Sequence, residues 1–348
     1  MRSHHHSTLR AFAMGMALCM VFGTASCFGN TSSDESDSTQ SSSTEQTEPI
    51  EVVASVNQWG SLAEQIGGDY VNVSSILSST GVDAHGFEPS TSDMASLQKA
   101  QVVVSNGAGY DAWATKNIQK GMVSVSAAQM VGAAEGDNPH LWFSNDARNA
   151  MAKELADTYS RIMPSRKKYF TKKLASWQKG EDKVEQAMKS FSDKHSDAAY
   201  AATESVAYYL LSDMGVEDKT PEGYLQSAAS ESEPAPADLQ EFQELLEKHK
   251  VDVLVNNAQA SSDATNMLTG TANKSELPVF DVTEQMPSDQ ESLTAWICSL
   301  VESLTTLFDE QSESASSDES GDASSESSDD SGTSSDSTSD AAQPDPGK

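Results

Sequence analysis

Two histidines of this chain sit in loops whose composition suits the presentation of a side chain to a ligand. His85 lies in the glycine-punctuated residues 81–89 (GVDAHGFEP), and His140 lies in residues 137–142 (DNPHLW), where a proline fixes the approach of the chain. Imidazole is the most common metal ligand among protein side chains, so these loops suggest the binding of a divalent transition metal. On the residues alone, the alternative that both are ordinary loop histidines stays open.

Two further histidines remain after the expected removal of an N-terminal signal, and their settings differ. His195 and His249 lie in the charged runs DKH and KHK, directly before expected strands, and we interpret both as surface residues. The sequence contains no recognisable nucleophile motif, no glycine-rich phosphate loop and no His-Glu-x-x-His pattern. These observations favour a binding protein over an enzyme.

The segments that would position His85 alternate apolar runs with amphipathic stretches. Residues 51–56 are an expected strand, a second strand begins near Tyr70, and residues 101–105 are a third. A helix between residues 51–56 and the strand near Tyr70 ends at a pair of glycines, and a later helix is opened by Ser92 or Asp93. Apolar strands interleaved with helices favour a parallel sheet covered on both faces. Ligand sites of such sheets lie at the carboxyl ends of the strands.

The second half of the folded part repeats this theme after a long helical stretch. An amphipathic run over residues 165–191 predicts a helix of roughly 40 Å at about 1.5 Å per residue, which would connect two lobes. Further strands are expected at residues 198–203, 251–255 and 278–280. A loop is expected at 223–236 and a final helix at 288–308. The predicted fold class is therefore α/β, with two βα lobes whose parallel sheets face a cleft and are joined by one long helix.

The N-terminus has the features of an export signal. Arg2 and Arg10 supply positive charge, and residues 11–23 form an apolar stretch that is too short to span a bilayer. Residues 24–27 (TASC) resemble the lipobox of bacterial lipoproteins, with threonine where leucine is usual. We expect lipidation of Cys27, with simple secretion as the alternative, and hence anchoring to the outer face of the cell membrane.

Composition bounds the partners and the domain organisation. The chain has 348 residues and a net charge of −31, from 22 basic and 53 acidic residues, which makes nucleic acid an unsuitable partner. Its three cysteines are too few for a disulfide framework. Ser-rich and acidic segments at both ends are expected to be disordered. The expected parts are a signal peptide (1–26), a tether (27–49), an N-terminal lobe (50–164), the connecting helix (165–191), a C-terminal lobe (192–310) and an acidic tail (311–348).

Several motifs resemble one known family. Residues 83–89 (DAHGFEP) and 138–142 (NPHLW) are similar to the two histidine motifs of the zinc/manganese solute-binding lipoproteins of bacterial metal ABC importers, of the cluster A-I type. The resemblance continues in order through residues 231–234 (ESEP), 236–239 (PADL) and 277–281 (LPVFD). It covers roughly residues 50 to 310. The chain departs from the family at residues 257–259, where NAQ replaces Glu-Pro-Gln, and in lacking a histidine-rich loop.

The resemblance implies a set of ligands for one Zn²⁺ or Mn²⁺ ion. It adds two carboxylates to the two histidines, one at a position where members carry histidine or glutamate, so that the set reads His85, His140, Glu204 and Asp281. Zinc is satisfied by four single contacts, whereas manganese prefers more oxygen contacts, which bidentate carboxylates supply. Glutamate at position 204 therefore favours manganese slightly.

The function implied is the extracytoplasmic capture of the ion and its delivery to the permease of an ABC importer. We expect a monomer, because the site would be complete within one chain. Four protein ligands leave no open position on zinc for a reacting water, which is a further reason to expect no catalysis. The alternatives are a surface adhesin with a structural metal and a secreted metallohydrolase.

Overall fold

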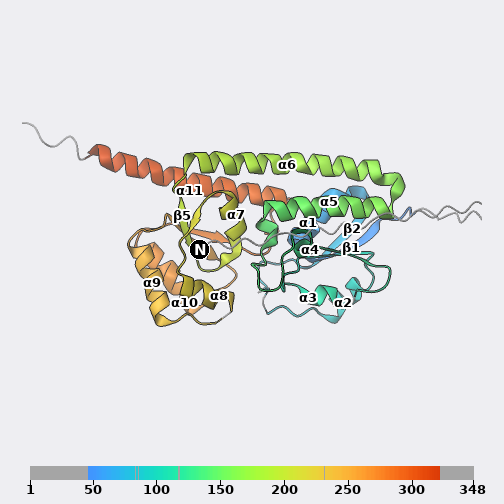
Figure 1. Ribbon diagram of the computed structural model, residues 1–348, viewed down its shortest axis with the longest axis horizontal. Helices are drawn as coiled ribbons and strands as arrows, with labels where there is room; N and C mark the ends of the chain where they lie inside the picture. The colour runs from blue at the N-terminus through green and yellow to red at the C-terminus, as the bar shows by residue number, and fades with distance from the viewer. Residues whose placement is uncertain (1–45, 83, 85, 117, 231, 322–348) are drawn as a thin grey trace, which may run out of the picture. The chain divides into compact units, whose positions relative to one another are not determined.

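The computed structural model describes residues 46–321 except 83, 85, 117 and 231 (Figure 1). All described residues belong to the compact unit of residues 45–348. The expected signal peptide, the lipidation site Cys27, most of the tether and residues 322–348 of the expected tail lie outside the described part. No helix of the described part is long and apolar enough to cross a membrane.

The first lobe is built on a fully parallel sheet of four strands in the order β2-β1-β3-β4. Most residues of the central strands are apolar and buried on both faces, as expected for a sheet that helices cover on both sides. The strands are β1 Ile50–Val56, β2 Val71–Leu77, β3 Val102–Ser105 and β4 Val123–Ser126.

Helices and short 3-10 turns connect these strands. They are α1 Asn57–Gly67, η1 Gly68–Tyr70, α2 Thr91–Leu97, α3 Ala112–Thr115, α4 Ala127–Val131, η2 Leu141–Phe143, α5 Asn145–Ile162 and η3 Pro164–Arg166. Helix α2 starts earlier than the sequence suggested. Ser90 is its N-cap, and the side chains of Ser90 and Asp93 each bind the backbone of the other, as in a capping box.

The expected connecting helix is present as α6, Lys167–Lys194, with 28 residues. Its buried side chains recur at helical spacing and form one stripe: Phe170, Trp177, Glu181, Val184, Met188 and Phe191. The last long helix, α11 Leu293–Gly321, lies alongside α6 (Figure 1). Gly180 permits this close approach, because a Cβ there would lie 3.3 Å from Cγ2 of Thr294.

The second lobe has the same strand order as the first, β6-β5-β7-β8, again fully parallel. The strands are β5 Ala199–Ala202, β6 Glu217–Asp218, β7 Val253–Asn257 and β8 Val279–Val282. The connecting elements are η4 Ser205–Ala207, α7 Tyr208–Asp213, α8 Glu222–Ala229, α9 Pro236–Glu247 and α10 Asp263–Lys274. The expected fold class, two α/β lobes with parallel sheets and a long helix, is confirmed.

Three local expectations differ from the structure. The expected loop 223–236 contains helix α8, because Tyr224 is buried with its ring edge-on to Phe242, with 4.8 Å between the ring centroids. Helix α11 continues into the expected tail as far as Gly321, since neither proline nor glycine occurs between Phe308 and Gly321. Strand β8 extends beyond the expected 278–280 to Val282.

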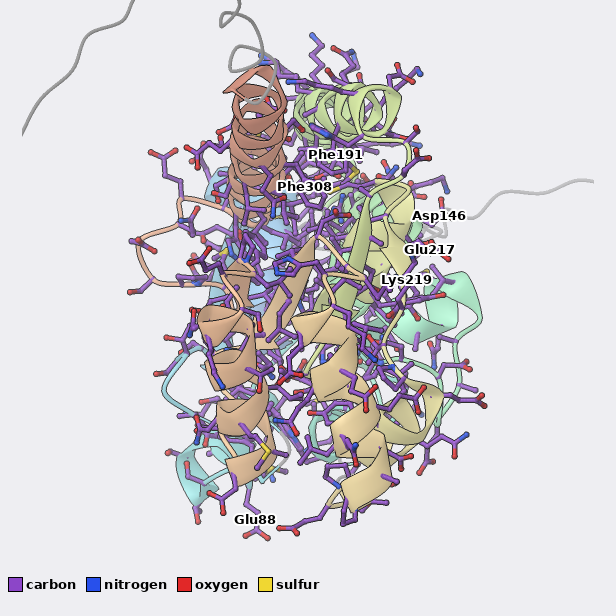
Figure 2. All side chains as sticks on the ribbon, turned by 90° about the vertical axis from the view of Figure 1, so that its left-hand side faces the viewer. Glu88, Asp146, Phe191, Glu217, Lys219 and Phe308 are labelled. Atoms are coloured by element: carbon purple, nitrogen blue, oxygen red, sulfur yellow. The ribbon has the colours of Figure 1, made fainter. Side chains whose placement is uncertain are left out.

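The expectation that His195 is a surface residue is wrong. Its side chain is 8% exposed and its Nε2 lies 2.8 Å from a carboxylate oxygen of Asp309. The ring also packs against Phe191, near the C-terminus of α6, and Phe308, in the middle of α11, which lie beside each other (Figure 2). The prediction rested on the charged residues next to His195 in sequence, whereas the environment of its ring is apolar and is formed partly by residues distant in sequence. His249 is exposed, as expected.

Candidate metal centre

His140 is held in one orientation by the residue two positions before it. The side-chain oxygen of Asn138 accepts the backbone N–H of His140 at 3.0 Å and lies 2.8 Å from its ring Nδ1. The amide of Asn138 cannot be reversed, because its Nδ2 donates to the carbonyl of Ser205 at 2.8 Å. Nδ1 of His140 therefore carries the proton, and Nε2 offers its lone pair to a ligand. The residue is 3% exposed.

The loop that carries His140 is held in place by hydrogen bonds to its backbone carbonyls. Asn106, which follows strand β3, donates from Nδ2 to the carbonyl of Pro139 at 2.7 Å, and its side-chain oxygen accepts the indole N–H of Trp59 at 3.0 Å. The hydroxyl of Tyr209 donates to the carbonyl of Asn138 at 3.0 Å from the second lobe. Side chains from both lobes thus hold the backbone carbonyls of the loop that carries the imidazole.

Two carboxylates of the second lobe converge on His140. Glu204 directly follows the buried region of strand β5, and its Oε1 lies 3.7 Å from Nε2 of the imidazole. Glu284 lies two residues after strand β8, and its Oε2 lies 3.9 Å from the same nitrogen. One ligand atom from each of the three residues lies within 4.8 Å of the other two. One imidazole and two carboxylates form a donor set that suits a divalent transition metal.

The turn that carries Glu284 is fixed by amide side chains. Its backbone N–H and that of Gln285 donate to Oε1 of Gln259 at 2.7 and 3.0 Å, and the side chain of Gln58 donates to the Glu284 carbonyl. The hydroxyl of Tyr110 donates to Oε2 of Glu284 at 2.6 Å. Burial, together with the charge of Glu284, raises the pKa of Tyr110 far above its usual value, so this phenol stays a donor.

Asn257 lies between the two carboxylates at the end of strand β7. Its Nδ2 donates to Oε2 of Glu204 at 2.7 Å and to Oε1 of Glu284 at 3.1 Å. This is the first residue of the segment NAQ, where the sequence departs from the family pattern. The amide therefore bridges the two acids.

Among the residues predicted as ligands, the structure brings together His140 and Glu204. His85 lies outside the described residues. Asp281 is not part of the group: it is an exposed residue inside strand β8, and its carboxylate accepts from the side chain of Asn256 at 2.7 Å. Glu284, and not Asp281, lies beside His140 and Glu204.

The alternation of strand β8 was the available signal for this difference. Phe280 and Val282 are buried and Asp281 between them is exposed, which is the period of two expected of a strand that continues to residue 282. The first acidic residue beyond the end of such a strand is Glu284. The sequence analysis expected the strand to end at Phe280, and this expectation placed Asp281 at the carboxyl edge of the sheet.

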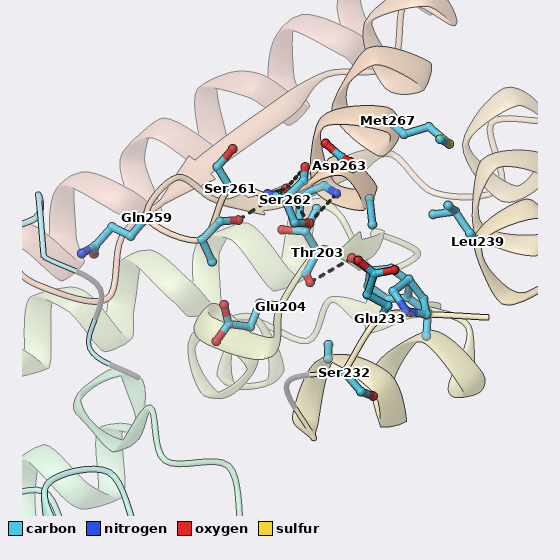
Figure 3. Close-up of a pocket in the computed structure, with 16 residues that line it drawn as sticks. Thr203, Glu204, Ser232, Glu233, Leu239, Gln259, Ser261, Ser262, Asp263 and Met267 are labelled. Carbon is cyan, nitrogen blue, oxygen red and sulfur yellow. Dashed lines mark hydrogen bonds between the residues drawn. The ribbon is translucent and has the colours of Figure 1, made fainter. Parts of the chain in front are cut away.

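Two cavities meet at Glu204. One, of about 490 Å³, is lined by both lobes, including Tyr110, Asp137, His140 and Glu204. The other, of about 500 Å³, lies within the second lobe, and Figure 3 shows the Glu204 carboxylate turned away from the Glu233 and Asp263 side chains across it. The first cavity therefore reaches both His140 and Glu204, whereas the second reaches Glu204 alone of the three residues.

Two parallel-sheet lobes that jointly surround a metal-type donor set define a two-lobed ligand-binding protein. The profile of the family described as zinc-uptake complex component A, periplasmic, matches residues 52–307. The chain therefore belongs to this family of solute-binding proteins of metal importers.

Curated relatives and a solved structure agree with this membership. The manganese ABC transporter substrate-binding lipoprotein of Streptococcus pneumoniae is 25% identical over 289 residues, covering 78% of this chain and 87% of the relative. A zinc-binding lipoprotein of the same species is 24% identical over 250 residues, covering 64% of this chain and 48% of the relative. The laminin-binding protein Lbp of Streptococcus pyogenes has a TM-score of 0.62 at 19% identity, covering 74% of this chain and 99% of that structure, which shows the fold alone.

Proposed function

We propose that the protein captures one divalent transition metal ion, zinc or manganese, outside the cytoplasm and delivers it to the permease of an ABC importer. The observation that carries this proposal is the convergence of His140, Glu204 and Glu284 from two lobes onto one point. The manganese and zinc relatives support the same cargo class. The fourth ligand, proposed from the sequence, is His85.

The arrangement suits binding and release better than catalysis. Two carboxylates neutralise the charge of a divalent ion, and the neutral imidazoles complete its coordination. With four protein ligands no position stays open for a reacting water, so we propose that the protein is not an enzyme. The cavity of about 490 Å³ between the lobes gives the ion a route to and from the site.

The proposed setting is the outer face of the cell membrane. Relatives of this chain are named as lipoproteins, which supports lipidation at Cys27. We propose that it acts as a monomer, because donors from both lobes of a single chain form the site, and that it binds no nucleic acid. Membership of the importer family favours this function over the adhesin alternative.

The first test measures metal content and competition between zinc and manganese on the mature protein without its lipid. The wild type is expected to hold one tight equivalent. Glu204→Ala and Glu284→Ala remove direct ligands and should weaken binding by more than the roughly 10- to 100-fold typical of an outer-shell partner. Asp281→Ala is the matched control and should bind as the wild type does.

Two results would contradict the proposal. A wild-type protein that holds no stoichiometric ion after loading would remove the metal site. Binding that depends on Asp281 and not on Glu284 would remove the ligand assignment. Delivery is tested separately, by growth in chelated medium of cells that carry the importer with wild-type or Glu284→Ala protein, where the variant should fail to support uptake.

A further inference from the structure

Four exposed lysines form a stripe along one side of helix α6. At 3.6 residues per turn, positions 168, 172, 179 and 183 lie within about 60° of one another around the helix. This side is roughly opposite the buried side chains of α6, which pack against the rest of the molecule. Figure 1 shows α6 at the outer edge of the described part, with α5 and α11 on its inner side. The lysine stripe consists of Lys168, Lys172, Lys179 and Lys183.

The lysine stripe differs from the other lysines of the same helix in having no acidic partner. Further along α6, Nζ of Lys189 lies 2.8 Å from a carboxylate oxygen of Asp193. Nζ of Lys194 lies 2.6 Å from a carboxylate oxygen of Asp309 on α11. Within the described part of the chain, none of the four stripe lysines forms an ion pair. Their positive charge is therefore available to an anionic group from elsewhere.

The spacing of the stripe lysines also works against the helix that carries them. Lys168 and Lys172 are four residues apart, as are Lys179 and Lys183, and like charges at this spacing repel and weaken a helix. Asp182 is exposed next to the last pair, but it forms no ion pair with a described residue. An anionic partner along this side would therefore stabilise α6.

The chain itself supplies an acidic segment directly after the helix that lies against α6. Residues 322–348, which follow α11, carry seven acidic side chains and one lysine. Residues 28–45, the acidic stretch before the described part, carry only four acids. Helix α11 runs in the same direction as α6, because Thr294 donates to Glu181 at 2.8 Å near its start and Asp309 pairs with Lys194 further on.

Residues 322–348 are long enough to reach the lysine stripe. From Asp309 to Gly321, α11 extends about 18 Å at about 1.5 Å per residue, and from Lys183 to Lys194, α6 extends about 16 Å. A return path of about 35 Å needs roughly 10 or 11 extended residues at 3.3–3.6 Å each. More than half of the segment then remains to follow the stripe, which is about 22 Å long.

We propose that the lysine stripe of α6 is a docking surface for the acidic residues 322–348 of the same chain. The contact depends on salt, because the range of interaction between exposed charges falls from about 10 Å at 0.1 M ionic strength to about 3 Å at 1 M. The stripe contains none of the proposed metal ligands. Loss of the contact should therefore leave ion binding unchanged.

The test attaches a nitroxide spin label to the mature chain and records which backbone amide signals the label broadens. The chain is produced from residue 28, Cys298→Ser removes its remaining native cysteine, and Ser337→Cys provides the attachment point. At low salt, the amide signals around the lysine stripe should be broadened. In about 1 M sodium chloride, where charges are screened, the broadening should disappear.

A variant with glutamine at all four stripe positions should also lose the broadening. The matched control removes the same charge from four exposed lysines outside α6, and it should keep the broadening of the wild type. Its substitutions are Lys116→Gln, Lys120→Gln, Lys250→Gln and Lys274→Gln. If the stripe variant does not fold, the comparison of low and high salt with the native lysines in place still decides.

Several results would overturn the proposal. One is the absence of broadening from the Ser337→Cys label at low salt. In that case, broadening from a label at Ser42→Cys would assign the surface to residues 28–45. A response of the stripe signals to phosphatidylglycerol vesicles, and not to phosphatidylcholine vesicles, would assign it to an anionic membrane. Broadening from the Ser337→Cys label that persists in high salt or in the stripe variant would place the segment near α6 without a role for the lysines.

Discussion

The two lobes have the same strand order but carry different chemistry at the carboxyl ends of their strands. In the first lobe, strand β1 is followed by Asn57 and Gln58, and strand β3 by Asn106. In the second lobe, the two glutamates of the site follow strands β5 and β8, with one amide, Asn257, between them. One architecture thus presents neutral amides on one side of the site and negative charge on the other.

An amide of the first lobe helps to position the second-lobe turn that carries Glu284. Asn57 donates to the carbonyl of Met286 at 2.7 Å and accepts its backbone N–H at 3.2 Å, so it fixes the turn that carries Glu284. The buried acid of the first lobe, Asp111, accepts backbone N–H groups of Asn106 and Gly107 at 2.6 and 2.8 Å. Burial raises the pKa of Asp111. The first lobe therefore supplies position and the second supplies charge, and variants of the two should fail in different ways.

The largest effect on stability is expected at the buried ion pair between Arg148 and Glu181. Arg148 of α5 is buried, its guanidinium lies 2.9 Å from Glu181 of α6, and it also donates to the carbonyls of Trp142 and Phe143, which follow His140. Arg148→Ala leaves Glu181 buried without its charge partner, which costs about 3–5 kcal/mol. Urea unfolding of the metal-free protein measures the loss.

The control for this variant lies on the same helix. Arg161 pairs with Glu154 at 2.8 Å in an exposed position. Arg161→Ala should cost at most about 1 kcal/mol, the ordinary value of a surface pair. Equal losses in the two variants would show that the brace behind His140 contributes no special stability.

The next effect separates charge from stability in the second lobe. Glu284→Gln keeps the size of the side chain and removes one of two neighbouring negative charges. We expect the metal-free variant to melt at the wild-type temperature or higher. Stabilisation by added metal should fall, and a 100-fold loss of affinity corresponds to about 2.7 kcal/mol.

Thermal melts with and without metal measure both quantities. Asp281→Asn makes the same chemical change outside the site and should keep the full metal-induced shift. A Glu284→Gln protein that is unstable without metal would contradict the division of labour between the lobes, because the acid would then be a structural group.

A smaller effect is expected at the amide that holds the His140 loop. Asn106→Ala leaves the indole N–H of Trp59 buried without its acceptor and releases the carbonyl of Pro139. The expected cost is about 1–3 kcal/mol in the free energy of unfolding, with a loss of metal affinity smaller than that of Glu284→Gln.

Asn72→Ala is the comparison for Asn106→Ala. Its side chain donates to Glu51 at 2.7 Å on the surface of the same sheet, so its removal should change stability by less than about 0.5 kcal/mol. If Asn106→Ala weakened metal binding as much as Glu284→Gln did, the claim that the first lobe positions the site while the second supplies its charge would be contradicted.

The smallest effect is expected away from both lobes' strand ends, where α6 meets α11. Hydrogen bonds from Lys194 and His195 lower the pKa of Asp309 below its ordinary value of 3.8. A lowered folded-state pKa stabilises the fold above pH 3.8 and loses that contribution as the pH falls through the folded-state value.

Asp309→Asn should therefore lower the melting temperature slightly at neutral pH, and the difference from wild type should disappear in acid. Melting curves at several pH values with Asp193→Asn, which pairs with Lys189 on the surface at 2.8 Å, provide the comparison. A difference that grew as the pH fell would have the wrong sign for this mechanism.

Much of the fold follows from local patterns in the sequence. The apolar runs that became β1, β3 and β7 have no polar alternation, and only a parallel sheet covered on both faces accommodates them. The connecting helix was evident from its apolar stripe. These features depend on neighbours in sequence, which is why they could be predicted.

The parts of the site that escaped prediction depend on residues far apart in sequence. Glu284 is recognisable as a candidate ligand only once strand β8 is known to reach Val282 and the turn is seen to be held by Gln58 and Gln259. The role of Asn257 needs both of its acid partners, which lie 53 and 27 residues away. No local pattern encodes such a three-residue contact.

The bonds between Asn57 and Met286 span 229 positions of the chain, and this separation sets the order in which the molecule can assemble. Each sheet uses strands from its own stretch of sequence and can form early, whereas closing so long a loop costs entropy that only the finished structure returns. A nascent or translocating chain that ends before the turn would have both sheets and no brace for Glu284. Ion binding is thus a property of the completed chain, acquired last.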